Sequence, residues 1–259
     1  MSTQLWDLRV DKVIAELKEG RRGDSRKIDE YRKLEVIRGI GENADGSARV
    51  KLGNTDVVAG VKMMVGEPYP DSPDEGSISV GAELLPLASP DFEFGPPREG
   101  AIELSRVVDR GIRESGAVDF KGLSIVGGES CWVGFVDIYA INHDGNLFDA
   151  CSIAAVAALL ETKMPKLENN KVVKGEYKGK LSLKCRPVLN TFAKVGNVIV
   201  VDPALSEEKA MNARFSVCMM DDDGICAYQK GLSGSFTISE INGTIDTAIK
   251  NSKQIRKLL

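Results

Sequence analysis

The sequence predicts an α+β fold in which helices pack on mixed or antiparallel sheets. Several strand-like runs precede each long helix, and this order favours helices on one face of a sheet. Each half of the chain also has a strand, an acidic Asp-Gly turn and then a helix, with one more strand intervening in the second half. This order indicates a duplicated β-α core. The composition, 42% hydrophobic and 28% charged in 259 residues, is typical of one large globular domain or two small ones.

The N-terminal segment, residues 1–30, is predicted to be a helix followed by a basic linker. Four apolar residues recur at helical spacing: Val10, Val13, Ile14 and Leu17. Gly20 stands where a left-handed residue caps a helix. Residues 21–27 then carry a run of arginines, which on its own is expected to be a solvated linker.

Residues 31–165 are predicted to form the first core domain. Strands are expected at residues 47–52, 56–65, 77–85, 123–126 and 131–142. A helix is expected over residues 101–115, closed by Gly116. A second helix, residues 148–162, is rich in alanine, which permits close packing against a sheet, and Met164-Pro165 ends it.

The second core domain is predicted at residues 181–259, after a polar, lysine-rich connector at residues 166–180. Strands are expected at residues 181–185, 198–201, 215–220 and 225–230. A final helix begins near Ser239, and four isoleucines are expected along one of its faces: Ile241, Ile245, Ile249 and Ile255.

Charge, cysteine count and hydropathy restrict the function classes. The chain has 34 Lys and Arg against 38 Asp and Glu, a net charge of −4, so any RNA contact must come from a local basic cluster. Five cysteines with no CxxC pair and a single histidine do not predict a zinc site. No apolar run is long enough to span a membrane and no signal peptide is recognised, so a cytoplasmic protein is expected.

The helix at residues 101–115 carries the clearest candidate binding face. Leu104, Val108 and Ile112 make a buried stripe, and three arginines share an exposed face: Arg106, Arg110 and Arg113. A row of guanidinium groups suits successive phosphates of one nucleic acid strand. The alternative is that these arginines form ordinary surface pairs with the acids of the same helix: Glu103, Asp109 and Glu114.

Two further segments are weaker candidates. The turn at residues 144–147 precedes a helix, whose N-terminus attracts anions, but no Lys, Arg or Ser lies between Asp144 and Asp149. Asp149 is expected to cap that helix and to repel phosphate, so the turn is predicted to be structural. Acids following a strand, Asp202, Glu207 and Glu208, suit Mg²⁺ binding or acid-base work, although such residues are more often a solvated turn. The lone His143 is predicted to be exposed.

Segments across nearly the whole chain resemble the RNase PH family. They are residues 23–26, 57–62, 66–71, 83–90, 102–115, 144–147 and 201–203, in the family's order. The likeness is greatest to the non-catalytic RNase PH-type ring subunit of the archaeal exosome. The resemblance implies an RNase PH-like fold with a duplicated β-α core. It also implies a hexameric ring of three heterodimers with a catalytic RNase PH-type sister, RNA-binding cap proteins, and phosphate-dependent 3′–5′ degradation of single-stranded RNA.

The resemblance further implies that this subunit is not catalytic. The catalytic sister carries a Gly-Thr/Ser-Arg phosphate loop before the helix, whereas this chain has Gly145-Asn146-Leu147. No cofactor is therefore expected on this subunit; inorganic phosphate, with Mg²⁺ as a candidate cation, is used by the complex. The family's RNA path runs beside the helix of Arg106, Arg110 and Arg113. Asp202 lies near the strand of the catalytic acids, but residues 209–214 lack a carboxylate, so it is not assigned as catalytic.

Two alternatives to the non-catalytic RNA-binding subunit stay open from the sequence. One is a free-standing phosphorolytic exoribonuclease, and the other is a structural scaffold without RNA contact. One departure from the family also leaves the role of Arg22 and Arg26 open: Ser25 stands where relatives commonly have glycine.

Overall fold

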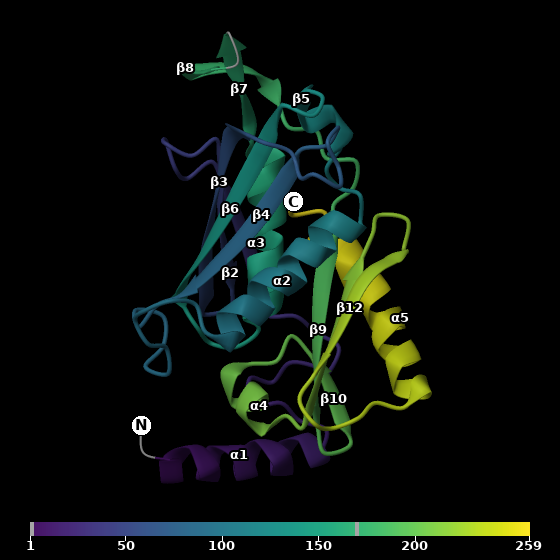
Figure 1. Cartoon of the computed structure of the whole chain (residues 1–259). Coiled ribbons are helices and arrows are strands. Elements are labelled where there is room, and N and C mark those ends of the chain that lie inside the picture. Colours follow the sequence, from purple (N-terminus) through teal and green to yellow (C-terminus); the bar gives the residue numbers. More distant parts are fainter. Residues whose placement is uncertain (1–2, 169–170) are drawn as a thin grey trace.

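The computed structural model describes residues 3–168 and 171–259, and Figure 1 shows two main sheets with helices between and beside them. The larger sheet has the order β1-β2-β3-β6-β4, with β5 paired to β6. Its strands are β1 (Leu34–Arg38), β2 (Gly46–Leu52), β3 (Thr55–Gly66), β4 (Ser77–Leu84), β5 (Ser124–Val126) and β6 (Ser130–Asn142). β4 runs parallel to β6 and the other pairs are antiparallel, so the predicted mixed sheet of an α+β fold is confirmed.

The smaller sheet is antiparallel, in the order β10-β9-β11-β12. Its strands are β9 (Val188–Val195), β10 (Val198–Val201), β11 (Ala213–Met219) and β12 (Ile225–Gly231). Five helices and a short 3-10 turn, Lys121–Leu123, complete the described chain. The helices are α1 (Thr3–Lys18), α2 (Glu99–Glu114), α3 (Leu147–Glu161), α4 (Leu205–Ala210) and α5 (Ile238–Ile255).

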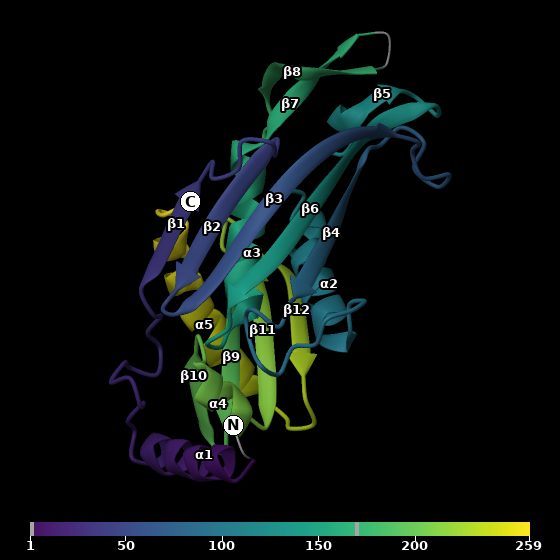
Figure 2. The same ribbon diagram turned by 90° about the vertical axis from the view of Figure 1, so that its left-hand side faces the viewer.

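The elements stack as sheet, helices, sheet and helix. α3 packs on β2 and β3 of the larger sheet and also on β9 of the smaller one, and α2 lies beside it against β4 and β12. α5 covers the other face of the smaller sheet, and α1 lies across α4 at the end far from β5 (Figures 1 and 2). α2 and α3 therefore lie between the two sheets.

α3 forms the centre of the core. All of its residues from Leu147 to Leu159 except Phe148 are buried. The alanines predicted to pack against one sheet in fact contact two, because small side chains let both sheets approach the helix closely. One close approach also excludes a side chain at Gly46, where a Cβ atom would lie 2.4 Å from the carbonyl oxygen of Ala158.

The prediction of a strand at residues 181–185 is wrong. Residues 181–185 form no strand and contribute only an isolated bridge from Leu183 to Val118. The strand lies further on, at β9, where Asn190 and Thr191 interrupt the apolar pattern. Both polar residues are fully buried, and their side chains form hydrogen bonds with α5 and α3. Because these polar groups have partners, β9 lies in the core despite the two polar residues.

The segment at residues 166–180, predicted to be a polar connector, lies in a β-hairpin of β7 (Lys163–Glu168) and β8 (Lys171–Lys180). This hairpin projects from the end of the larger sheet (Figure 2). The predicted row of isoleucines forms part of the buried face of α5: Ile255 is buried, and Ile241 and Ile249 are partly buried against the smaller sheet. The other residues that the helix buries are Thr244, Ala248, Asn251 and Ser252.

Candidate functional site

The candidate binding face lies on α2, whose packing follows the predicted pattern. Leu104, Val108 and Ile112 are buried, together with Ala101, Val107 and Gly111. Gly111 lies at the close contact of α2 with the smaller sheet, where a Cβ would lie 3.1 Å from Sγ of Cys218. The apolar side of α2 is thus fully used by the core, and its other side is left to solvent.

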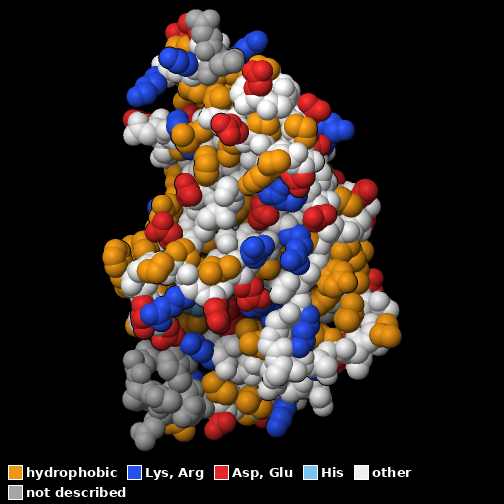
Figure 3. Space-filling model, viewed as in Figure 1, with side chains coloured by type: hydrophobic (Ala, Val, Ile, Leu, Met, Phe, Trp, Pro, Cys, Tyr) orange, Lys and Arg blue, Asp and Glu red, His pale blue; other side chains and the backbone are white. Residues whose placement is uncertain are grey.

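The structure brings Arg106, Arg110 and Arg113 together on the exposed side of α2. We call these three the α2 arginines; Figure 3 shows basic side chains gathered over this helix. Arg113 donates to the carbonyl oxygen of Ile78 at 3.1 Å and to Oδ1 of Asp109 at 3.2 Å. Arg110 reaches Oε1 of Gln229 at 3.4 Å. Arg106 has no hydrogen-bond or ion-pair partner among residues 3–168 and 171–259.

The acids of α2 do not neutralise this row. Glu103 forms its ion pair with Arg214 of β11, on the buried side of the helix. Asp109 pairs with Arg113 alone. Within the described chain, Glu114 forms no ion pair with any arginine. Two of the three guanidinium groups therefore keep their charge uncompensated at the surface, which disfavours the interpretation as ordinary surface pairs.

Arg214 fixes α2 to the rest of the molecule. Its guanidinium lies 4.0 Å above the ring of Phe148 of α3 and pairs with Glu103 of α2. The side chain is largely buried, and a Cβ at Gly231 would lie 2.7 Å from it, so glycine is needed there. This contact joins α2, α3 and the smaller sheet at one point and holds the α2 arginines in a defined position.

The N-terminus of α3, the weaker candidate for an anion site, is capped by Asn146. Asn146 has a left-handed φ of 54°, and its Oδ1 accepts a hydrogen bond of 3.3 Å from the backbone N–H of Asp149. The prediction that Asp149 is the capping residue is therefore wrong. Asp149 lies in the first turn of the helix, fully buried, and accepts hydrogen bonds from Tyr31 and Thr191. Burial raises the pKa of Asp149 to about 6.

A carboxyl group of the chain itself occupies this helix N-terminus. The backbone N–H of Asn146 donates to Oε1 of Glu208 at 2.7 Å. Glu208 belongs to α4, and its side chain is only 16% exposed. Burial raises the pKa of Glu208 to about 7. The carboxyl group of Glu208 thus lies beside the helix N-terminus, where its charge, when ionised, would repel a phosphate.

Asp202 is a structural centre rather than an available carboxylate. It is fully buried, and it accepts from Arg26 at 2.9 Å, from Arg32 at 2.7 Å and from Nδ2 of Asn146 at 2.8 Å. Because both of its oxygens are engaged, neither is free to bind a metal ion or a reacting group. The expectation of a solvated turn at residues 202–208 is wrong. Glu207 is buried as well, and residues 205–210 form α4.

The basic linker is exposed over most of its length, as predicted, but the side chains of two of its arginines are largely buried. Arg22 is 4% exposed and holds Glu207 with two hydrogen bonds of 2.8 and 2.6 Å. The side chain of Arg26 is 9% exposed and pairs with Asp24 and Asp202. Ser25, between them, has a left-handed φ of 64°, which explains physically why glycine suits this position. Sequence reasoning missed this network, because the partners lie about 180 residues apart.

His143 is half-buried, and the prediction that it is exposed is wrong. Its ring stacks on Phe92 with centroids 5.3 Å apart. Burial, together with the nearby charge of Lys209, lowers the pKa of His143 to about 4, so the ring is neutral at physiological pH. Over the described part of the chain, no group of three or more His, Cys, Asp or Glu residues is arranged to hold a metal ion. No helix in that part is long and apolar enough to cross a membrane.

Comparison with known proteins identifies the class. Residues 30–165 match the RNase PH family model described as 3′ exoribonuclease family, domain 1, and residues 185–251 match the model for domain 2. The chain belongs to the RNase PH family, as its sequence motifs had predicted, and its fold is the RNase PH-like α+β fold.

Particular relatives are close. The chain is 49% identical over 253 residues to a Thermococcus gammatolerans protein named exosome complex component Rrp42, covering 96% of this chain and 93% of that protein. It is 49% identical over 248 residues to the protein of the same name from Methanopyrus kandleri, covering 95% and 93%. Among solved structures, it resembles a chain of the Archaeoglobus fulgidus exosome with RNA bound to the active site, with a TM-score of 0.91, 44% identity and 98% coverage of both chains.

Proposed function

We propose that this chain is a non-catalytic subunit of an archaeal-type exosome core ring. In this role it binds single-stranded RNA through the α2 arginines and supports the active site of a catalytic RNase PH-type sister subunit. The similarity to proteins named exosome complex component Rrp42, and to an archaeal exosome structure, supports membership of such a ring. The ring is a hexamer of three heterodimers that carries RNA-binding cap proteins, works in the cytoplasm and shortens RNA from its 3′ end.

The single observation that carries the non-catalytic assignment is the hydrogen bond from Asn146 to Glu208. Phosphorolysis requires a bound phosphate ion, and helix N-termini with free N–H groups are common phosphate sites. At α3 the N–H group is already bonded to a carboxyl group, and neither a hydroxyl nor an arginine follows it in Gly145-Asn146-Leu147. A second negative charge there would be repelled whenever Glu208 is ionised. Phosphate, with Mg²⁺ as a candidate cation, therefore belongs to the sister's site, and this subunit needs no cofactor.

The assignment of RNA binding rests on the charges left on α2. Arg106 and Arg110 have no acidic partner in the described chain, while the row as a whole lies on a rigid, well-packed helix. The planar guanidinium group is pre-organised, so less conformational entropy is lost for each hydrogen bond that it forms. This arrangement favours an RNA contact over a purely structural scaffold.

Phosphorolysis assays with the chain alone and in its complex test the proposal. The purified chain, given RNA and inorganic phosphate, is expected to release no nucleoside diphosphate. Co-expression with the catalytic RNase PH-type sister is expected to give an alternating hexamer that releases them. Activity of the pure chain alone, at the level of the complex, would make it a free-standing phosphorolytic enzyme. Failure of the two chains to co-purify would contradict the ring.

A further inference from the structure

The β7–β8 hairpin is a basic segment in a chain that is acidic overall. Residues 163–180 contain six lysines and two glutamates, a local charge of +4. Since the net charge of the whole chain is −4, the remainder carries −8. The general field of the protein therefore repels RNA, and this segment is a local exception.

Contacts within the hairpin leave half of these lysines without partners. Both glutamates, Glu168 and Glu176, pair with the same residue, Lys166, at 3.0 and 2.8 Å. Lys180 pairs with Glu161 of α3, and Lys163 lies over the ring of Tyr177. The remaining three have no acidic partner in the part of the chain that the structure describes: Lys171, Lys174 and Lys178. We call these three the hairpin lysines.

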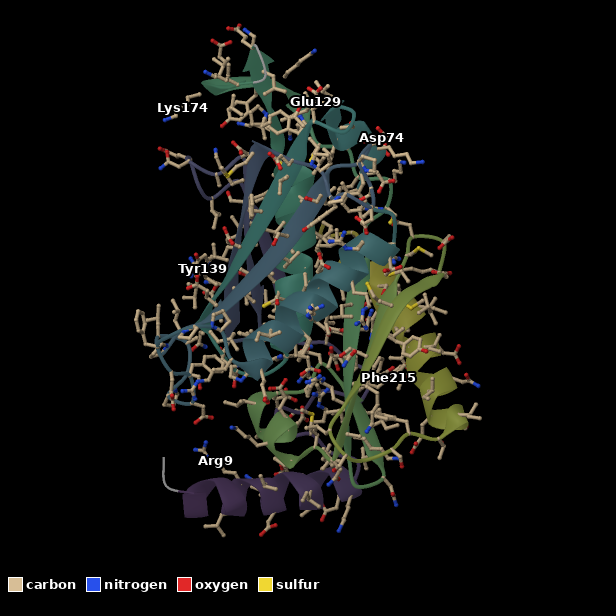
Figure 4. The ribbon with its side chains drawn as sticks, in the orientation of Figure 1. Arg9, Asp74, Glu129, Tyr139, Lys174 and Phe215 are labelled. Atoms are coloured by element: carbon tan, nitrogen blue, oxygen red, sulfur yellow. The ribbon has the colours of Figure 1, made fainter. Side chains whose placement is uncertain are left out.

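The hairpin lysines all lie on β8, whose outer edge is unpaired. Among the described residues, β8 pairs with no strand other than β7, and all of its residues except Val173 are exposed. The base of the hairpin is held to the core by two backbone hydrogen bonds. The N–H of Lys163 donates to the carbonyl oxygen of Asp45, and the N–H of Leu181 donates to that of Thr162. Figure 4 shows Lys174 extending away from the body of the molecule, with Asp74 and Glu129 on the other side of the same end. The positive charge is thus held out from the molecule on a fixed base.

We propose that the hairpin lysines form a second RNA-binding surface, which contacts the phosphates of single-stranded RNA outside the α2 contact. This inference rests on the proposed RNA-binding function. Three unpaired ammonium groups along one exposed strand can contact successive phosphates of a flexible RNA strand that follows the strand edge. Their positive charge attracts RNA, whereas the net negative charge of the rest of the protein repels it. An edge strand can also use lysines merely to prevent association with other edges. That role predicts a change in aggregation with no change in RNA affinity.

The test compares two triple variants of the assembled ring. One is Lys171→Gln/Lys174→Gln/Lys178→Gln, and the control removes the same charge from the surface at α5: Lys250→Gln/Lys253→Gln/Lys257→Gln. The probe is unstructured single-stranded RNA of graded length, with affinity measured at 50 and 200 mM salt. Three lost phosphate contacts reduce the salt slope by roughly 2, so wild type should lose about 20-fold more affinity than the hairpin variant over this range. The loss should appear only with the longer RNAs.

Equal behaviour of the hairpin variant and the control would overturn the inference. So would aggregation of the hairpin variant with unchanged RNA affinity, which would leave the lysines as protection of an edge strand. Arg106→Ala in the same assay separates the two proposals. If Arg106→Ala weakens binding and the hairpin variant does not, only the second surface is refuted. If neither variant changes binding, the proposed RNA-binding function fails as well.

Discussion

The backbone N–H of Asn146 and Oε1 of Glu208 form a hydrogen bond of 2.7 Å that closes the N-terminus of α3. Asn146 caps the start of α3, in the first half of the sequence, and Glu208 lies in α4, in the second half. The bond places the carboxyl group of Glu208 at the N-terminus of α3. The proposed lack of catalysis depends on this contact.

Replacing Glu208 by glutamine should change the pH dependence of stability. Burial raises the pKa of Glu208 from an ordinary 4.5 to about 7, so between these values the folded state binds more protons than the unfolded state. Stability of the wild type therefore falls as pH rises from about 5 to 7, and Glu208→Gln lacks this loss. The variant should exceed wild type by about 1–3 kcal/mol at pH 8 and match it near pH 4.

Urea denaturation at several pH values measures this difference. Asp149, whose pKa is also raised, is present in both proteins and cancels in the comparison. Parallel stability curves for wild type and Glu208→Gln across this pH range would contradict a buried, protonating Glu208.

Asp202→Asn should destabilise the protein strongly. Asparagine has nearly the same shape and tolerates the left-handed φ of 47° found at this residue, so the substitution removes mainly the charge. Arg32 would then be largely buried without its acidic partner and Arg26 would keep only Asp24, which costs about 3–5 kcal/mol. Asp24→Asn, which removes the more exposed partner of Arg26, is the control and should cost less than about 1 kcal/mol. Similar unfolding free energies for the two variants would show that Asp202 is not a structural centre.

Gly145→Ala should be more costly than a change at an equally strained but open glycine. Gly145 has a φ of 90°, and an added Cβ would lie 2.5 Å from backbone atoms of residues 203–205. Gly196 has a φ of 60° with nothing within 4 Å, so alanine there meets backbone strain alone, about 1 kcal/mol. We expect Gly145→Ala to cost at least about 3 kcal/mol, measured by thermal or chemical unfolding. Equal costs at the two sites would mean that the turn is not held against residues 203–205.

The parts of the fold that follow from local patterns were predictable from the sequence. The stripe of Leu104, Val108 and Ile112 predicted α2 and its exposed arginines, and the strands expected at residues 47–52 and 56–65 correspond to β2 and β3. β9 was missed, because Asn190 and Thr191 look like surface residues until their buried partners are known. The burial of Arg22 and Glu207 was missed for the same reason, since no local spacing reports a pair 185 residues apart.

Missing arginine and hydroxyl groups in Gly145-Asn146-Leu147 predicted the loss of a phosphate site, but the sequence did not reveal what replaces the phosphate. Glu208 reaches Asn146 only because residues 203–205, just before and at the start of α4, pack against the turn at Gly145. The lysine-rich segment that contains β8 was predicted to be a connector for a similar reason. The alternation of its lysines with glycine and glutamate hides which charges are paired, and only the structure assigns both glutamates to Lys166.

The most direct measurement is the RNA affinity of the assembled ring across a salt series for wild type, Arg106→Ala and Arg110→Ala. Arg49→Ala, an exposed arginine of β2 paired with Asp56, is the control. Each lost phosphate contact should lower the salt slope by roughly 0.7, so wild type should lose about 2- to 3-fold more affinity than either α2 variant between 50 and 200 mM salt. The effect should be the same for all RNA sequences, and folding should change by less than about 0.5 kcal/mol. Affinities and slopes equal to those of wild type and Arg49→Ala would contradict an RNA-binding role for α2.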